Sequence, residues 1–229
     1  MNFYMVVEGE VGEKQVYGNW IPYVNPALRC ALTINDVTED SFYIISGGGY
    51  PNLLEVIDSA VEDMSILVRQ GTAIFDRLVI AVDSEEESHN LKYKEIDSIV
   101  LDSLARLRLS HLDYKIIVQH FCLETWALGN KRLVTNNIKQ VELGELINHH
   151  NVAKYDPELL TPKDPESMNR AQTATKYLKL LLNNKNKSLT YNKGNPGALL
   201  HMKYFEQIKQ RADDTGHIPS FKSFIDAFQ

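Results

Sequence analysis

The run Leu78-Val79-Ile80-Ala81-Val82, followed by Asp83-Ser84-Glu85, decides the fold class of this 229-residue chain. Five consecutive apolar residues, three of them β-branched, predict a strand that is buried on both faces. Strands of this kind occur in parallel sheets that helices cover on both sides. We therefore expect an α/β fold with a mainly parallel sheet, in which Asp83 lies at the carboxyl end of a central strand.

Further strands and helices are predicted on both sides of this run, because β-branched and aromatic runs alternate with segments of helical period. The other predicted strands are Phe3–Val7, an edge strand at Leu28–Ile34, Phe42–Ile45 and Tyr114–Phe121. Between the strands, one helix is expected to start at Asn52 as N-cap and to end before Gly71. The residues expected on its inward face are Leu53, Val56, Ile57, Ala60, Val61, Met64, Leu67 and Val68. A second helix is expected to direct Ile96, Ile99, Val100, Leu104 and Leu107 inward. Pro22 and Pro26 are expected to interrupt regular structure after a short turn or helix at Val11–Gly18.

The strand pattern ends near Asn130, and the rest of the chain has helical periodicity. The helices expected there are Val141–His149, Pro165–Leu182, Ala198–Arg211 and Ser220–Phe228. We therefore expect two parts, an α/β core over residues 1–130 and a basic helical C-terminal extension over residues 131–229.

The charge is unevenly distributed along the chain, although the formal net charge is -6. Residues 1–125 carry 9 Lys and Arg against 20 Asp and Glu, whereas residues 126–229 carry 15 against 10. The stretch from Met168 to Arg211 holds nine basic residues and one acid, Glu206. Such a stretch is typical of phosphate contacts in nucleic-acid binding, and a solvated helical face is the alternative. The candidate contacts are Lys176, Lys179, Lys185, Lys187 and Lys203.

Composition excludes several classes of protein. No apolar run approaches the ~18 residues of a membrane span, and the N-terminus lacks the basic and then apolar layout of a secretion signal. A cytoplasmic protein without a membrane partner is therefore expected. Cys30 and Cys122 lie in apolar stretches, which favours reduced, buried thiols over a disulfide framework.

Acids follow three of the predicted strands. Glu8 follows Phe3–Val7, Asp83 and Glu85 follow Leu78–Val82, and Glu124 follows Tyr114–Phe121. Ligands of open α/β sheets bind at the carboxyl ends of the strands, so these acids are expected to converge. Carboxylates with water and substrate phosphate are the ligands that Mg²⁺ prefers, whereas strand-end acids also serve as helix caps. Glu86 and Glu87 are expected to be solvated loop acids.

Four segments resemble the Toprim domain of topoisomerases, primases and the overcoming-lysogenization-defect nucleases. Val6-Val7-Glu8-Gly9-Glu10 resembles its opening glutamate motif, and Leu78–Glu85 resembles its Asp-x-Asp motif, with Glu85 in place of the second Asp. Phe121-Cys122-Leu123-Glu124-Thr125-Trp126 and the Ser46–Leu54 junction resemble segments of small stand-alone Toprim-like proteins of bacterial anti-phage defence. Tyr191-Asn192-Lys193-Gly194 resembles a Tyr-x-Lys element whose lysine completes the site in these nucleases.

The resemblance implies an endonuclease that cleaves DNA or RNA with Mg²⁺ or Mn²⁺. Asp83 and Glu85 would hold the ion, and Glu8 would complete its shell or act as general base. Glu124 would hold a second ion, and Lys193 would offset charge on the phosphoryl oxygens. The resemblance also implies a role in antiviral defence with a partner ATPase of the structural-maintenance (SMC) or transporter (ABC) type, because the sequence has no P-loop motif of its own.

Other functions remain open at this stage. The Toprim-like core could be a non-catalytic interaction module in an ATPase complex, which the Glu at position 85 leaves room for. The acids would also serve a phosphoryl-transfer enzyme with a small phosphate ester as substrate. The sequence leaves the oligomeric state open, a homodimer included.

Overall fold

A five-stranded parallel sheet forms the frame of the structure, a computed structural model that describes residues 1–72 and 75–229. The strands are β1 (Phe3–Val7), β2 (Arg29–Ala31), β3 (Ser41–Ser46), β4 (Arg77–Asp83) and β5 (Asp113–Gln119). Their order across the sheet is β2-β3-β1-β4-β5. The sheet confirms the predicted α/β fold class, and all five strand predictions correspond to observed strands.

The central strands are buried on both faces, as the apolar runs predicted. Phe3, Met5, Val6 and Val7 of β1 and Leu78 through Val82 of β4 have no exposed surface. β1 pairs in register with both neighbours, so that Val7 lies opposite Ser46 of β3 and Ala81 of β4. The carboxyl ends of these three strands therefore lie at one edge of the sheet.

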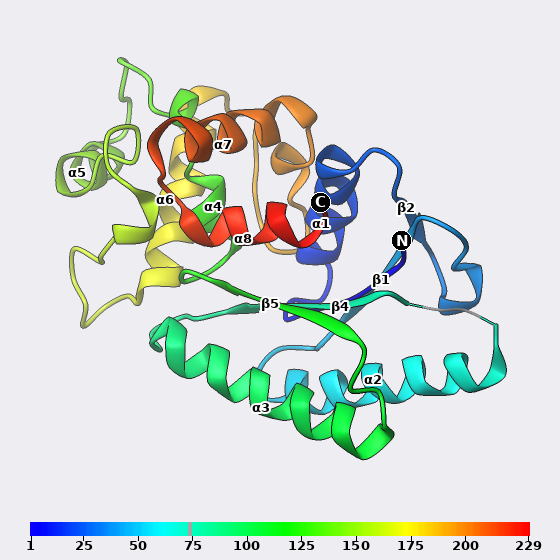
Figure 1. Cartoon of the computed structure of the whole chain (residues 1–229). Helices are drawn as coiled ribbons and strands as arrows, with labels where there is room; N and C mark the ends of the chain where they lie inside the picture. Colours follow the sequence, from blue (N-terminus) through cyan, green and yellow to red (C-terminus); the bar gives the residue numbers. More distant parts are fainter. Residues whose placement is uncertain (73–74) are drawn as a thin grey trace. The chain divides into compact units, whose positions relative to one another are not determined.

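Helices connect the strands and make up the rest of the chain. They are α1 (Gly12–Val24), α2 (Asn52–Gln70), α3 (His89–Leu107), α4 (Leu123–Ala127), α5 (Val141–His149), α6 (Arg170–Lys185), α7 (Met202–Thr215) and α8 (Pro219–Ala227). α2 and α3 contact each other and lie along one face of the sheet, with α1 on the other face (Figure 1). Within the described part of the chain, no helix is long and apolar enough to cross a membrane.

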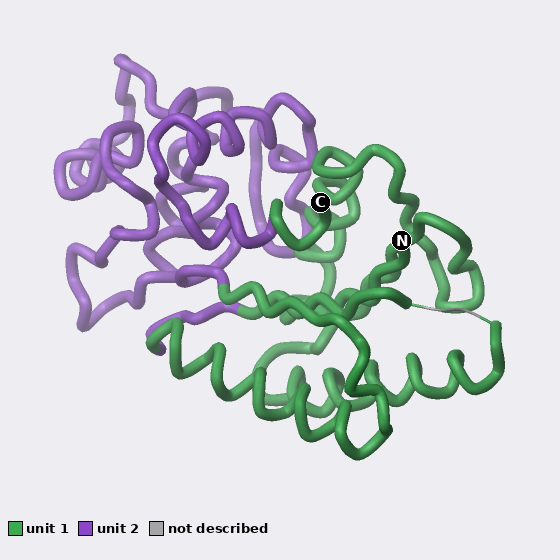
Figure 2. The backbone as a smooth tube through the Cα atoms, in the orientation of Figure 1, with its two compact units in different colours: residues 1–82, 88–118, 225–229 green, residues 83–87, 119–224 purple. Residues whose placement is uncertain are grey.

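The chain divides into two compact units (Figure 2). Unit 1 comprises residues 1–82, 88–118 and 225–229, and unit 2 comprises residues 83–87 and 119–224. In unit 1, a core of α2, α3 and strand residues includes the predicted inward residues Ile57, Val61, Ile96 and Val100, none of them exposed.

Several details differ from the sequence predictions. Pro22 lies inside the last turn of α1 and does not end the helix, which continues to Val24; its missing N–H costs α1 one intrahelical bond, the one to the Gly18 carbonyl. The N-cap of α2 is Pro51, whereas the Asn52 amide donates to the Gly47 carbonyl at 2.7 Å. Val68 of α2 is 43% exposed, and Cys30 is exposed on the short edge strand β2. Gly71 ends α2 with φ of 65°, as predicted.

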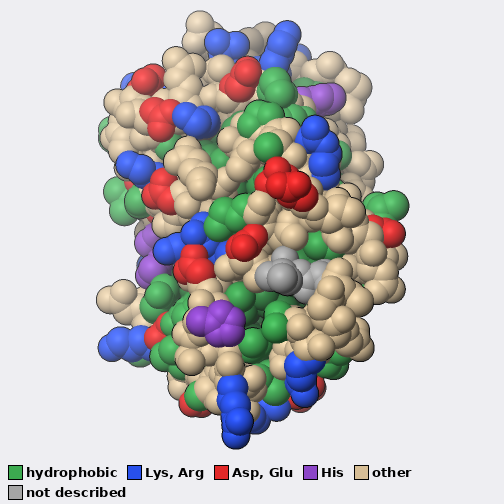
Figure 3. All heavy atoms as spheres, turned by 45° about the vertical axis from the view of Figure 1, so that its right-hand side comes forward, with side chains coloured by type: hydrophobic (Ala, Val, Ile, Leu, Met, Phe, Trp, Pro, Cys, Tyr) green, Lys and Arg blue, Asp and Glu red, His purple; other side chains and the backbone are tan. Residues whose placement is uncertain are grey.

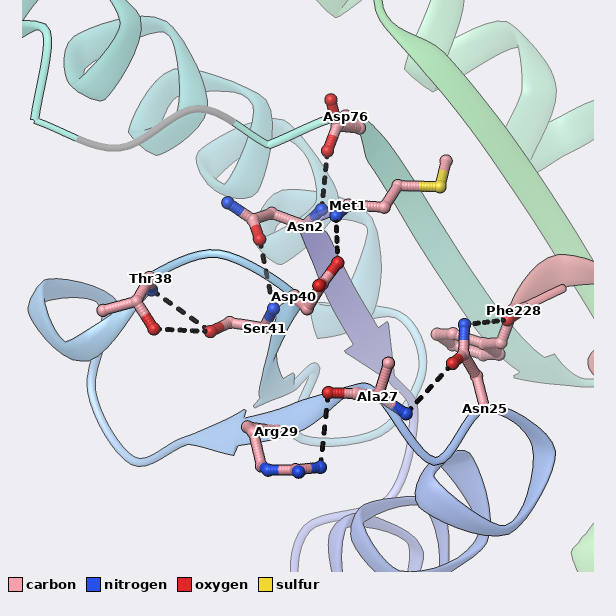
Figure 4. Close-up of polar contacts among 10 residues, drawn as sticks. All are labelled: Met1, Asn2, Asn25, Ala27, Arg29, Thr38, Asp40, Ser41, Asp76 and Phe228. Carbon is pink, nitrogen blue, oxygen red and sulfur yellow. Dashed lines mark hydrogen bonds and ion pairs between the residues drawn. The ribbon is translucent and has the colours of Figure 1, made fainter.

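The N-terminal residues join two loops at the amino end of the sheet in unit 1, the loops that lead into β3 and β4 (Figure 4). The Asn2 side chain accepts from the Ser41 N–H at 3.1 Å, and the Asn2 N–H donates to Asp76 at 2.6 Å. The N-terminal ammonium pairs with Asp40 at 2.5 Å. Asn25 donates to the Phe228 carbonyl at 3.2 Å. The contacts of Met1 and Asn2 fix the entries to β1, β3 and β4 at the amino end of the sheet.

Unit 2 has its own core, in which Trp126 packs against Phe221 and Phe224. Arg211 is 2% exposed and donates to the carbonyl groups of Gly129, Val152 and Tyr155. Burial lowers the pKa of this guanidinium to about 10, so it stays charged at neutral pH. One buried cation thus ties three separate segments of unit 2 together.

Candidate functional site

Two short backbone segments of unit 2 pair with each other and carry most of the predicted acids. The Ser84 N–H donates to the Gln119 carbonyl at 3.0 Å, and the Glu85 N–H donates to the Phe121 carbonyl at 3.1 Å. The Ser84 hydroxyl accepts from the Phe121 N–H at 3.1 Å. Glu85 and Phe121 have φ values of 47° and 79°, a left-handed conformation that costs non-glycine residues about 1–2 kcal/mol. Backbone strain of this kind concentrates at functional sites.

Buried polar side chains gather in these segments and in α4. Asp83, Ser84, Gln119, Glu124 and Thr125 are all at most 7% exposed. Both polar atoms of the Gln119 amide lack a hydrogen-bond partner among the described residues. Buried polar atoms are normally hydrogen-bonded, so a cluster of this kind calls for a ligand or a structural reason.

Two buried acids, Asp83 and Glu124, act on the thiol of Cys122. Burial raises the pKa of this thiol well above its ordinary value, and the nearby Glu124 and Asp83 carboxylates raise it further. Both carboxylates therefore lie close enough to the same thiol to act on it. The thiol stays protonated at neutral pH. The charged groups available to a cation here are therefore the carboxylate oxygens of Asp83 and Glu124.

A hydrogen bond from the chain's basic tail satisfies Glu124. The Tyr191 hydroxyl donates to Glu124 Oε1 at 2.9 Å, and both side chains are buried. Tyr191 leads directly into a tight turn, in which the backbones of Asn192 and Asn195 pair with each other. Lys193 lies in this turn and is exposed. The bond between Tyr191 and Glu124 therefore fixes the position of the turn that carries Lys193.

A pocket of about 630 Å³ in unit 2 brings four of the predicted site residues together. The acid is Glu85, and the cations are Lys176, Lys179 and Lys193. Polar groups of the first turns of α6 and the apolar side chains Ala171 and Leu180 complete the lining. We call this cavity the Glu85 pocket. Its three lysines could bind a phosphate group, and Glu85 could accept a proton or bind a cation.

Glu86 positions the Glu85 loop against α6, a role that the sequence analysis missed. Its carboxylate accepts from the N–H of Arg170, the first residue of α6, at 2.7 Å, and the Arg170 guanidinium lies 3.8 Å away. An acid at a helix N-terminus is favoured by the helix dipole. Glu86 and Glu87 are exposed as predicted, but Glu86 is also a helix cap. α6 also has a local capping box, in which the Asn169 side chain accepts from the Gln172 N–H, whereas a contact from the distant Glu86 loop leaves no local pattern in the sequence.

The remaining predicted residues lie at several places. Glu8 is half-buried directly after β1 in unit 1, where its N–H donates to the Ala81 carbonyl at 3.2 Å. Lys176 lines the Glu85 pocket and also pairs with Glu142. Lys185 and Lys203 line a different pocket of unit 2, and Lys187 is exposed after α6. The predicted lysines other than Lys187 thus divide between two pockets.

The carboxylates of Asp83 and Glu124 both act on the Cys122 thiol. Two carboxylate ligands are the number that suits Mg²⁺. Mg²⁺ keeps several water molecules and binds through one or two carboxylates and substrate phosphates. Among the described residues there is no group of three or more His, Cys, Asp and Glu side chains that could hold a metal ion. Asp83 and Glu124 are therefore the residues that fit a cation completed by water and phosphate.

Many acids of unit 1 have structural partners, which accounts for part of the negative charge of residues 1–125. Arg106 pairs with Asp58 at 2.5 Å and with Glu62 at 2.9 Å, and the Tyr114 hydroxyl donates to Asp97 at 2.7 Å. Burial and this bond raise the pKa of Tyr114 to about 12. On the face that Figure 3 shows, acidic and basic side chains are interspersed. The acids there do not form one continuous negative surface.

Comparisons with protein-family models, with curated proteins and with solved structures find no match to this chain.

Replacing Tyr191 with Phe tests the anchor of the basic turn. The variant leaves the buried Glu124 carboxylate without its hydroxyl donor, which should lower the free energy of unfolding by about 1–3 kcal/mol. Urea denaturation of both proteins measures this difference. The control is Tyr155→Phe, because Tyr155 is 59% exposed and its change should stay within about 0.5 kcal/mol. Equal losses in the two variants would contradict the assigned role of Tyr191.

Proposed function

We propose that this protein is a metal-dependent endonuclease of the Toprim type that hydrolyses phosphodiester bonds of nucleic acid. Two observations support the proposal: the Asp83 and Glu124 carboxylates both raise the pKa of the buried Cys122 thiol, and a pocket of unit 2 is lined by Glu85 and three lysines. Asp83 is two residues from Glu85, and Tyr191, which binds Glu124, is two residues from Lys193. Asp83 is therefore connected to the pocket through the backbone to Glu85, and Glu124 through its hydrogen bond to Tyr191 and the backbone from there to Lys193.

Different residues would bind the metal ion, bind the phosphate and accept the proton during hydrolysis. Asp83 and Glu124 would hold Mg²⁺ or Mn²⁺, which supplies Lewis-acid stabilisation of the phosphoryl oxygens when bound. Lys176, Lys179 and Lys193 would orient the phosphate and offset the negative charge that grows on it. Glu85, exposed at the pocket, is placed to take a proton from the attacking water.

Because its motifs resemble those of Toprim nucleases of anti-phage defence, the proposal includes a role in antiviral defence. A partner ATPase of the structural-maintenance or transporter type would supply any nucleotide-driven step, since the sequence has no P-loop. An interaction module without catalysis and a phosphatase for small esters are the rival functions. A lysine-lined pocket beside acids supports hydrolysis of a phosphodiester, and a long basic segment supports a polymeric substrate.

Cleavage assays test the proposal directly. Purified protein should cut plasmid, single-stranded DNA or total RNA in Mg²⁺ or Mn²⁺, and the reaction should stop with EDTA. Asp83→Asn, Glu124→Gln and Glu85→Gln should each lower the rate by about 100-fold or more, because each removes a ligand or the general base. Glu8→Gln tests the sequence-based assignment of Glu8 in the same assay.

The control for the cleavage assay is Glu166→Gln, which changes an exposed acid of unit 2 that lies outside the pocket. Its rate should equal that of the unchanged protein. Equal cleavage by the protein and by its Asp83, Glu124 and Glu85 variants would exclude this site. Hydrolysis of a small phosphate ester in place of nucleic acid would favour the phosphatase.

Charge reversal in the Glu85 pocket tests nucleic-acid binding. Lys179→Glu should weaken binding and lower the slope of log affinity against log salt by about 1, because one fewer phosphate is neutralised. Fluorescence anisotropy with a labelled oligonucleotide in EDTA, measured at several salt concentrations, gives both values. Lys163→Glu is the control, since Lys163 pairs with Glu145 at 2.9 Å and does not line the pocket. The same salt slope in Lys179→Glu and in the unchanged protein would assign Lys179 to a solvated face.

A further inference from the structure

A second cavity of unit 2, about 520 Å³ in volume, lies outside the candidate nuclease site. It is formed by the short helix Lys131–Leu133, the end of α6, the loop at Leu189 and the start of α7. We call it the Arg132 pocket. Its volume lies within the range of about 300–1,000 Å³ that is typical of small-molecule sites.

The charged residues that line the Arg132 pocket are all basic. They are Arg132, Lys185 and Lys203, and no acid is among the described lining residues. Lys185 Nζ donates to the Arg132 carbonyl at 2.7 Å, which holds these two residues side by side. Three cations without a neutralising acid favour an anionic ligand, and a group with two negative charges suits them best.

The start of α7 adds to this preference. Met202 and Lys203 are the first residues of the helix and line the pocket together with His201, the N-cap residue. The His201 side chain makes no capping hydrogen bond. A helix N-terminus directs backbone N–H groups toward an anion, and here it supplements the three cations.

The rest of the lining is mostly apolar and partly rigid, with Asn130 and Gln207 as its polar members. Leu133 and Leu182 are at most 2% exposed, and Tyr204 is held by its hydroxyl, which donates to the Ala127 carbonyl at 2.8 Å. Leu189 and Met202 complete this side of the pocket. The open apolar surface is that of Met202, which is 51% exposed, and of the partly exposed Leu189. An anion such as inorganic phosphate would leave this surface, the apolar wall of the pocket, uncovered, whereas a ligand with a flat apolar part would cover it.

We propose that the Arg132 pocket binds a nucleoside monophosphate, with the phosphate at Arg132, Lys185 and Lys203 and the base against the apolar wall. The ligand is either a free nucleotide or the 5′-terminal nucleotide of a strand, because both present the same phosphate and base. The proposal goes beyond the nuclease function and does not depend on it.

Calorimetric titration of the full chain with AMP, adenosine and inorganic phosphate tests the pocket. AMP should bind at least about tenfold more tightly than either fragment, since only AMP covers both the cations and the apolar wall. An oligonucleotide with a 5′ phosphate that competes with AMP, beside one with a 5′ hydroxyl that does not, identifies a strand end as the source. Competition by neither identifies the free nucleotide.

Two matched variants localise the binding. Lys203→Glu should weaken AMP binding at least about tenfold, whereas Lys193→Glu, in the Glu85 pocket, should leave it unchanged. Lys203 is exposed, so its replacement should not prevent folding, which circular dichroism checks. Asp83→Asn should bind AMP normally even if it abolishes cleavage, which separates this proposal from the nuclease. No binding of AMP, equal binding of phosphate, or a loss in Lys193→Glu in place of Lys203→Glu would overturn the proposal.

Discussion

The buried hydrogen bond between Tyr191 and Glu124 is the interaction on which the candidate site depends. A carboxylate that is 2% exposed is costly unless a donor satisfies it, and the Tyr191 hydroxyl does so at 2.9 Å. The same bond holds the turn that carries Lys193, so a cation of the basic tail is fixed where the Glu85 pocket opens.

Most of the fold could be predicted because local patterns determine it. The apolar runs of β1 and β4 have few alternatives to a strand buried on both faces, and the stripes of α2 and α3 follow the helical period. The predictions that were wrong concern residues whose position depends on tertiary contacts and not on the local sequence. Asn52 resembles a helix cap, but its amide bonds to the Gly47 carbonyl, and Cys30 lies on an edge strand too short to bury it.

The candidate site could be predicted only in part, for the same reason. Asp83 and Glu85 follow a recognisable strand, and the lysines stand out by their number. The contacts that position these residues join segments far apart in the sequence. Glu86 meets Arg170 across 84 positions, and Tyr191 meets Glu124 across 67. No local pattern records such pairs, and none indicated that the lysines divide between the Glu85 and Arg132 pockets.

The central claim is that Asp83 and Glu124 together bind a divalent cation. Mn²⁺ binding to the purified full chain, followed by electron paramagnetic resonance of the free ion, tests this claim without any substrate. The account predicts saturable binding that Mg²⁺ competes for and that Asp83→Asn and Glu124→Gln each weaken at least about tenfold. Glu166→Gln should bind as the unchanged protein does. No saturable binding, or equal binding by all four proteins, would contradict the account.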